Sequence, residues 1–247
     1  MTRNLNQTGL LPQADIDRFA IGIIGTGAIG SFVAMALSKM GFTNICTWDP
    51  DKIEEHNIAN QMFPVDSVGM KKAIATRAMV KQFSGTDIST LSLKASGNNI
   101  SRQFDALYPG KIRIVILAVD SLDTRKAIAE CLYMRPDMAI VDARMGALTY
   151  RVMGLQTNLA ADWGPYRNTF VADSSAVQEP CGQKSIIYTV LGVAAEICSF
   201  VHRIVMSPSY NFDIPNPVVF DYKTGIRIQK ITPSEIVDFT VNETVPY

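Results

Sequence analysis

The sequence predicts an α/β fold, a mainly parallel sheet with helices on both faces that antiparallel strands extend in the C-terminal half. Short apolar runs alternate with helix-like runs as far as about residue 142, which is typical of a parallel sheet covered on both faces. A glycine-rich turn joins the first of these strands to the first helix. Beyond residue 142 the regular alternation ends and strand-like pieces follow one another more closely.

In the N-terminal half, each expected element follows from its apolar pattern and its flanking turn residues. Strands are expected near residues 20–25, 44–49, 88–94, 112–119 and 138–142. Helices are expected near residues 28–40, 70–83 and 122–134.

The C-terminal half has a different texture. Residues 149–158 alternate well enough for an antiparallel strand, and residues 160–183 form a loop-like stretch rich in Gly, Pro, Asp and Ser. Loops of that length inside a domain are usually functional or disordered. Residues 185–206 are apolar nearly all round, which predicts a helix buried against the sheet or in a subunit interface. Two strand-like pieces, residues 216–222 and 226–231, follow in the C-terminal tail.

Length and composition are consistent with one domain. The 247 residues are 47% hydrophobic and 19% charged, enough to bury one substantial core. We therefore expect a single domain over 1–247, with an N-terminal arm (1–19), a nucleotide-binding half (20–142) and a C-terminal extension (143–247).

Charge and hydropathy give no sign of nucleic-acid or membrane binding. The 23 basic residues balance the 23 acidic ones and form no long basic run. The N-terminal segment has no apolar core of the signal-peptide kind, and the apolar stretches have the length of strands. We expect a cytoplasmic protein.

The glycine-rich turn reads Gly25-Thr26-Gly27-Ala28-Ile29-Gly30 and predicts a Rossmann-like phosphate site. Such glycines let the backbone approach a phosphate chain, and the helix start offers free N–H groups and partial positive charge. Asp49 follows Gly25 by 24 residues at the end of the second strand, where a carboxylate can accept ribose hydroxyls. An NAD enzyme would show the same features.

The residues after Asp49 are less expected of an NAD enzyme. Asp51 adds a second acid, and Asn57, Asn60 and Gln61 crowd polar side chains beside the phosphate site. Two of them also have a plainer interpretation: Asp51 could cap a turn, and Asn57 could cap a helix.

Two further motifs follow in order. Residues 68–72, VGMKK, place lysines at the start of a helix, where one can lie over a triphosphate. The strand IRIVILAV ends at Asp120, and carboxyl ends of parallel strands are where ligands bind in open α/β sheets. Asp120 is therefore a candidate Mg²⁺ ligand.

Taken together, residues 20–206 resemble the ThiF/MoeB/E1 family of ATP-dependent activators of ubiquitin-like and sulfur-carrier proteins. The family motifs D-x-D-x-[VI]-x-x-S-N-L-x-R-Q, [IV]-G-x-x-K and D-N-x-x-x-R correspond here to DPDKIEEHNIANQ, VGMKK and DSLDTR. Several motifs in the same order are more specific than any single one. The spacing favours Lys72 as the family lysine.

The resemblance implies ATP and Mg²⁺ as cofactors and a small ubiquitin-like (β-grasp) protein with a C-terminal Gly-Gly tail as partner. Its carboxylate would become an acyl-adenylate, with the loop N–H groups, Lys72 and Asp120 neutralising the phosphates. A homodimer is also implied. Many relatives hold a four-thiolate zinc, but the four cysteines here lie far apart without a C-x-x-C pair, so we expect no structural zinc.

Many relatives then pass the acyl group to a cysteine, and Cys181 in QEPCGQ is the candidate here. It precedes the predicted helix at 185–206, and a helix N-terminus lowers the pKa of a thiol. Cys46, Cys131 and Cys198 lie in apolar runs and are expected in the core.

The sequence departs from the family at two arginines. Asn60 stands at the arginine of N-L-x-R-Q, and Asn6 stands at the second arginine of the N-terminal R-x-x-R-Q. Either Arg3, Arg125 or Arg144 compensates, with Arg144 expected to be an unpaired cation at the mouth of the sheet, or the chain is a non-catalytic partner subunit. The sequence is also compatible with a carboxylate-adenylating dehydratase of a small molecule or tRNA, and with an NAD(P) oxidoreductase.

Overall fold

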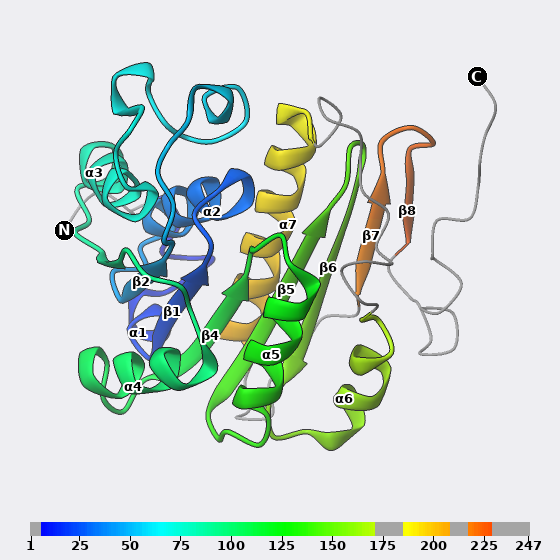
Figure 1. Cartoon of the computed structure of the whole chain (residues 1–247). Coiled ribbons are helices and arrows are strands. Elements are labelled where there is room, and N and C mark those ends of the chain that lie inside the picture. The colour runs from blue at the N-terminus through cyan, green and yellow to red at the C-terminus, as the bar shows by residue number, and fades with distance from the viewer. Residues whose placement is uncertain (1–5, 171–184, 208–216, 229–247) are drawn as a thin grey trace.

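The computed structural model describes residues 6–170, 185–207 and 217–228, and these form a single eight-stranded mixed sheet (Figure 1). The strands are β1 (Phe19–Ile24), β2 (Ile45–Trp48), β3 (Ser89–Leu91), β4 (Ile112–Leu117), β5 (Met138–Met145), β6 (Thr149–Gln156), β7 (Val218–Asp221) and β8 (Ile226–Ile228). Their spatial order is β3-β2-β1-β4-β5-β6-β7-β8.

The α-helices of the described residues precede β1 or lie in the connections between successive strands of the chain. They are α1 (Gln13–Ile16), α2 (Ala28–Lys39), α3 (Lys72–Ser84), α4 (Gly97–Leu107), α5 (Leu122–Leu132), α6 (Ala160–Arg167) and α7 (Ile187–Val205). Two short 3-10 turns, η1 (Glu55–Asn57) and η2 (Val65–Ser67), lie in the connection from β2 to α3.

The five strands of the N-terminal half are parallel and the last three are antiparallel, so the expected fold class is confirmed. The chain runs outward from β1 to β2 and β3 and then returns to place β4 on the other side of β1. Such a reversal opens a crevice beyond the carboxyl ends of β1 and β4, which is the usual ligand site of open α/β sheets.

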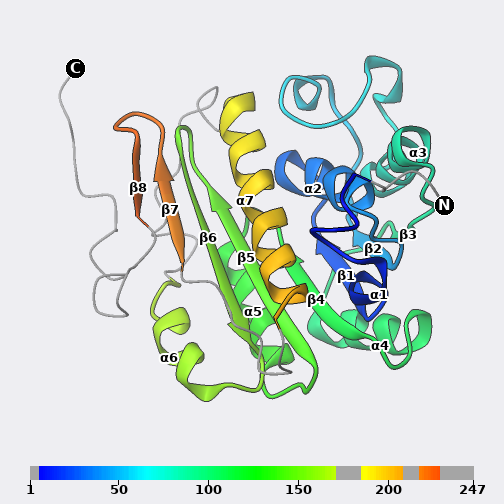
Figure 2. The ribbon, with the colours of Figure 1, turned by 180° about the vertical axis from the view of Figure 1, so that it is seen from behind.

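Two apolar layers bury both faces of the sheet. The first contains residues of α2, α3 and α7, and the second residues of α4, α5 and α6. Strand β1 is buried along its whole length and divides between them: Ile21 and Ile23 join the first layer, whereas Ala20 and Ile24 join the second. Figure 1 shows α5 in front of the sheet, and Figure 2, from behind, shows α7 in front of it.

Helix α7 packs against α2, β5 and β6, as the apolar segment at 185–206 predicts. By length and composition it could cross a membrane, but 50% of its most apolar window is buried inside the fold. Its buried side includes Phe200 and Ile204, whereas Leu191 near its start is 49% exposed. The helix therefore also carries apolar side chains on the side that does not face the sheet.

Two helices lie where the sequence pattern predicts none. Helix α4 has only a few apolar residues, but Ile100 and Phe104 are spaced to bury one side of it, and a capping box joins Ser96 and Asn99 at its start. Helix α6 occupies the first part of the stretch 160–183 that was expected to be loop, and it buries Trp163. Pro165 lies within α6 and has no N–H to donate, so this short helix lacks one of its internal hydrogen bonds.

Candidate active site

The glycine loop lies at the crevice between β1 and β4. Gly25 has φ +90, and a Cβ there would lie 2.7 Å from the carbonyl oxygen of Ala118 after β4. A Cβ on Gly30 would lie 1.8 Å from the carbonyl oxygen of Gly25, so both positions require glycine. Helix α2 begins at Ala28 after Gly27, without a side-chain cap. Its first N–H groups, including that of Ile29, are thus available to an anion.

Asp49 connects this loop to the end of β2. Its carboxylate oxygens accept hydrogen bonds from the backbone N–H of Thr26 at 2.7 Å and of Asp51 at 2.9 Å. Asp49 is 4% exposed. Each carboxylate oxygen has a second lone pair, so a ribose hydroxyl can still donate to it. The residue predicted to hold a ribose therefore also shapes the loop.

Asp51 and Lys72 form a second contact at this edge. The Lys72 Nζ lies 3.4 Å from an Asp51 carboxylate oxygen, and the Lys72 N–H donates to the Asp51 carbonyl oxygen at 3.0 Å. The side chain of Lys72 is 13% exposed and that of Asp51 is 64% exposed. Lys71 instead donates to the Pro50 carbonyl oxygen. Both lysines thus contact the segment after β2, only Lys72 pairs with an acid there, and the choice of Lys72 by family spacing stays a prediction.

The predicted amide side chains have different surroundings. The Asn57 side-chain oxygen accepts the Glu54 N–H at 2.9 Å, so Asn57 takes part in a helix cap, which was its plainer interpretation. Asn60 Nδ2 donates to Ser185 Oγ, 2.8 Å away at the start of the segment leading into α7. The Gln61 amide lies near Gly27, and its buried Oε1 has no partner among the described residues. Of the three, Gln61 is the one placed against the glycine loop.

Asp120 lies three residues beyond the end of β4 and is exposed. The Ala118 N–H donates to the Ile24 carbonyl oxygen at 2.8 Å, which fixes this segment beside the glycine loop. Within the described ranges, Asp120 makes no hydrogen bond or ion pair, and no group of three or more His, Cys, Asp or Glu side chains gathers to hold a metal. A cation here would use Asp120, phosphate oxygens and water, a ligand set that suits Mg²⁺.

Asp142 organises a buried cluster at the end of β5. Its side chain is fully buried, and one carboxylate oxygen pairs with Arg125 of α5. The other oxygen accepts two hydrogen bonds from Arg144, at 2.8 and 3.1 Å, and one from the Tyr166 hydroxyl at 3.0 Å. Burial raises the pKa of the carboxyl group, but the two guanidinium groups outweigh this, and its pKa is lowered. Arg144 also donates to the carbonyl and hydroxyl oxygens of Thr169.

The expectation of an unpaired Arg144 is therefore wrong. Arg144 is tied to Asp142 and Thr169, and Arg125 is 4% exposed and bound to Asp142 and to the Leu117 carbonyl oxygen. Neither arginine is free to replace the missing family cations. Arg3 and Cys181 lie outside the described residues.

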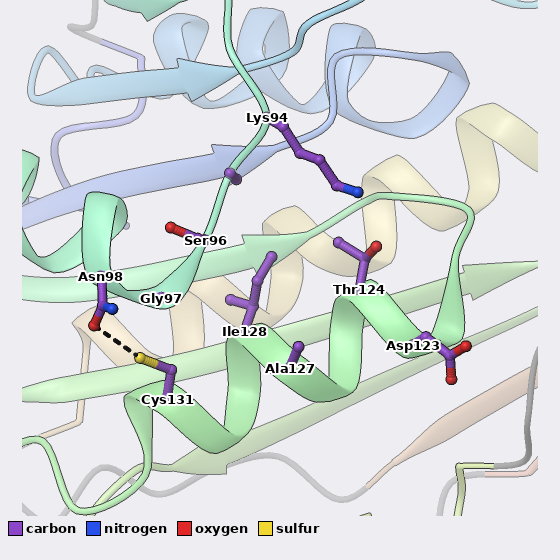
Figure 3. A pocket seen from close by; sticks show the side chains of 10 residues that line it. Lys94, Ser96, Gly97, Asn98, Asp123, Thr124, Ala127, Ile128 and Cys131 are labelled. Carbon is purple, nitrogen blue, oxygen red and sulfur yellow. Dashed lines mark hydrogen bonds between the residues drawn. The ribbon is translucent and has the colours of Figure 1, made fainter.

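The remaining cysteines differ in burial. Cys46 and Cys198 are buried as expected, and burial raises the pKa of each thiol to about 12. The expected core position of Cys131 is wrong: Cys131 is only partly buried and lines a hollow of about 450 Å³ between the segment after β3 and α5 (Figure 3). In Figure 3 the Lys94 side chain extends toward the end of this hollow formed by Asp123 and Thr124, which lie in the first turn of α5 shortly after Asp120 in the chain.

A glycine loop at a helix start, an acid after β2 and an acid after β4, all at one crevice, are features typical of the α/β class of nucleotide-binding folds. The chain belongs to the ThiF family, whose model matches residues 1–205.

Three known proteins illustrate the relationship. The NEDD8-activating enzyme E1 catalytic subunit of Arabidopsis thaliana is 30% identical over 132 residues, which are 51% of this chain and 28% of that protein. Ubiquitin-like modifier-activating enzyme 5 of Drosophila simulans is 27% identical over 117 residues, 44% of this chain and 29% of that protein. This chain thus spans under a third of the length of these relatives.

In fold, the chain is similar to the E. coli tRNA N6-threonylcarbamoyladenosine dehydratase solved in complex with AMP. The TM-score is 0.63 at 19% sequence identity, over 83% of this chain and 94% of that chain. At this identity the likeness concerns the fold.

Proposed function

We propose that this protein is an ATP-dependent adenylyltransferase that activates the C-terminal carboxylate of a small ubiquitin-like protein. The observation that carries the proposal is the meeting of the glycine loop, Asp49, Lys72 and Asp120 at one edge of the sheet. Family membership supports ATP as the nucleotide, and the activating enzymes among its relatives support a ubiquitin-like substrate.

The reaction follows from the charges involved. A carboxylate oxygen attacks the α-phosphorus of ATP, a P–O bond forms, and the bond to the pyrophosphate oxygen breaks. Because the carboxylate is already ionised at neutral pH, no general base is needed. Two anions must be held together, so positioning and charge neutralisation carry the catalysis.

Each residue has a role in that arrangement. The N–H groups of Gly27 to Gly30 donate hydrogen bonds to phosphate oxygens, and the Asp49 carboxylate accepts hydrogen bonds from the ribose hydroxyls. Lys72 turns from Asp51 toward the phosphates. The hollow lined by Lys94 and Thr124 has room for a nucleobase. Mg²⁺ at Asp120 would neutralise charge on the phosphates when it is bound.

A transfer step to Cys181 and assembly as a homodimer are parts of the same proposal. The thiolate would attack the acyl carbon, a thioester would form, and AMP would leave. The exposed apolar side chains of Ile187, Tyr188 and Leu191 near the start of α7 support self-association. Light scattering at high concentration tests the dimer, and a monomer would contradict it.

Pyrophosphate exchange tests the proposed reaction. The full chain is mixed with ATP, Mg²⁺, labelled pyrophosphate and a pool of synthetic peptides ending in Gly-Gly with a free carboxyl group. We expect label to enter ATP only when the peptides are present. No exchange with these peptides, but exchange with a small carboxylic acid or tRNA, would favour the dehydratase instead, and C-terminally amidated peptides serve as the control.

A further inference from the structure

Strands β5 and β6 carry two arginines directly opposite each other. Arg144 of β5 pairs in register with Arg151 of β6, so both side chains lie on the same face of the sheet. That face is the one of α6, because Arg144 and Tyr166 of α6 bind the same Asp142 carboxylate. Arg125 joins them from α5. Three guanidinium groups thus gather around one carboxylate.

Arg151 differs from its two neighbours in having no partner. Its side chain makes no hydrogen bond or ion pair with any residue that the structure describes, although it is partly buried. Burial, and then the charge of Arg144, lower the pKa of Arg151, while Asp142 acts in the opposite direction. A partly desolvated cation opposite another cation costs stability. An anion supplied from outside the described residues would offset that cost.

Arg151 lies a short distance from the strand end at which the proposed reaction takes place. Leu117 of β4, three residues before Asp120, is in register with Asp142 of β5. Arg151 lies on β6, the next strand beyond β5, and is therefore two strands away from β4. Two strand spacings correspond to roughly 10 Å. When the terminal carboxylate of a substrate tail lies at the phosphate site near Asp120, the residues just before that carboxylate can therefore lie over Arg151.

We propose that Arg151 binds the carboxylate of an acidic residue in the C-terminal tail of the substrate, upstream of the carboxyl group that is activated. This inference rests on the proposed function and names the class of tail that the site prefers. An extended peptide advances about 3.3–3.6 Å per residue, which places the acidic residue roughly three residues before the terminal carboxylate. A guanidinium group suits this contact because it can bind a carboxylate with two hydrogen bonds.

A peptide series tests the contact. Fluorescein-labelled peptides that end in Gly-Gly carry a single Glu at successive positions upstream, and a Glu-free peptide is the reference. Binding to the full chain is measured by fluorescence anisotropy with a non-hydrolysable ATP analogue and Mg²⁺ present. We expect the tightest binding with Glu about three or four residues from the end, by roughly tenfold, the value of one charge-assisted hydrogen bond.

Three variants distinguish a specific contact at Arg151 from an effect of the overall charge of the protein on peptide binding. Arg151→Gln should bind all peptides as weakly as the Glu-free one, Arg151→Lys should keep part of the preference, and Arg77→Gln, an exposed arginine on α3, should change nothing. Thermal unfolding of each variant checks the fold, and the lysine variant keeps the test valid if the glutamine variant is unstable.

Three results would overturn the inference: no Glu preference, a preference that is the same at every position, or a preference unchanged in Arg151→Gln. Absence of any peptide binding with ATP binding retained also counts against it. Calorimetry with ATP on the same samples distinguishes these from failure of the proposed function, in which the unaltered chain does not bind ATP.

Discussion

The carboxylate of Asp49 accepts the backbone N–H of Thr26 at 2.7 Å, and this contact joins the end of β2 to the glycine loop. The second carboxylate oxygen accepts the Asp51 N–H at 2.9 Å. One buried side chain thus fixes both segments that a nucleotide would touch. Ligand affinity and loop geometry are therefore expected to change together when Asp49 is altered.

Asp49→Ala should weaken ATP binding by about 1.5–3 kcal/mol and also lower the free energy of unfolding, because the buried Thr26 N–H and the partly buried Asp51 N–H lose their acceptor. Calorimetry gives the first quantity and urea unfolding the second. Asp66→Ala, at an exposed acid in η2, is the matched control and should alter neither. Unchanged ATP affinity in Asp49→Ala would refute the ribose role.

Lys72→Ala and Lys71→Ala form a second comparison. Lys72 lies beside Asp51 at the strand end, whereas Lys71 is bound to the Pro50 carbonyl oxygen. We expect the Kd for ATP·Mg²⁺ to rise about tenfold, or about 1.4 kcal/mol, in Lys72→Ala and to stay unchanged in Lys71→Ala. A larger effect at Lys71 would reverse the assignment.

Most of the fold could be predicted because its strands are strongly apolar. The run from Ile21 to Ile24 and the run IRIVILAV are buried on both faces, and buried parallel strands stand out by composition alone. Helix α4 was missed since its polar sequence buries only a few side chains. Its capping pair, Ser96 and Asn99, was the available signal. Helix α6 was missed because its Gly-Pro pair at 164–165 resembles loop sequence.

The candidate site was predictable where a motif fixes one residue to one strand end, as for Asp49 and Asp120. The contacts of Arg144 with Thr169 and of Asp142 with Tyr166 were not, because α6 and the residues after it reach the end of β5 only through packing on the sheet. The register that places Arg151 opposite Arg144 depends likewise on how the hairpin pairs.

Asp142→Asn should destabilise the fold by about 3–5 kcal/mol, because it leaves the buried Arg125 without a counter-charge. Urea unfolding measures the change. Asp87→Asn removes an exposed ion pair with Arg77 and should leave the free energy of unfolding nearly unchanged, because solvent screens exposed pairs. Equal losses in the two variants would contradict the central role of Asp142.

The same cluster predicts how stability depends on pH. The folded-state pKa of Asp142 is lowered, so its contribution is complete above the unfolded-state value of about 3.9. That contribution is lost as the pH falls through the lower, folded-state pKa. Asp142→Asn should therefore show a smaller loss of stability below about pH 4 than the unaltered chain. Parallel pH profiles would contradict this.

Cys181→Ser tests the proposed transfer step. With the tightest-binding tail peptide, pyrophosphate exchange should persist in the variant, because adenylation precedes attack by the thiolate. An adduct that thiols cleave should form on the unaltered chain and be absent from Cys181→Ser, as read by intact-protein mass spectrometry. The buried Cys46 provides the matched control, Cys46→Ser. Persistence of the adduct in Cys181→Ser would move the role away from Cys181.

Binding of ATP with Mg²⁺ at this crevice, through Asp120, underlies every step of the proposed reaction, and calorimetry of nucleotide binding measures it without any need for the substrate. ATP and NADH are titrated separately into the unaltered chain and into Asp120→Asn, with and without Mg²⁺. We predict that the unaltered chain binds ATP more tightly with Mg²⁺ and does not bind NADH, and that Asp120→Asn loses the effect of Mg²⁺ while keeping its fold. Tight binding of NADH without binding of ATP would contradict an ATP site at this crevice.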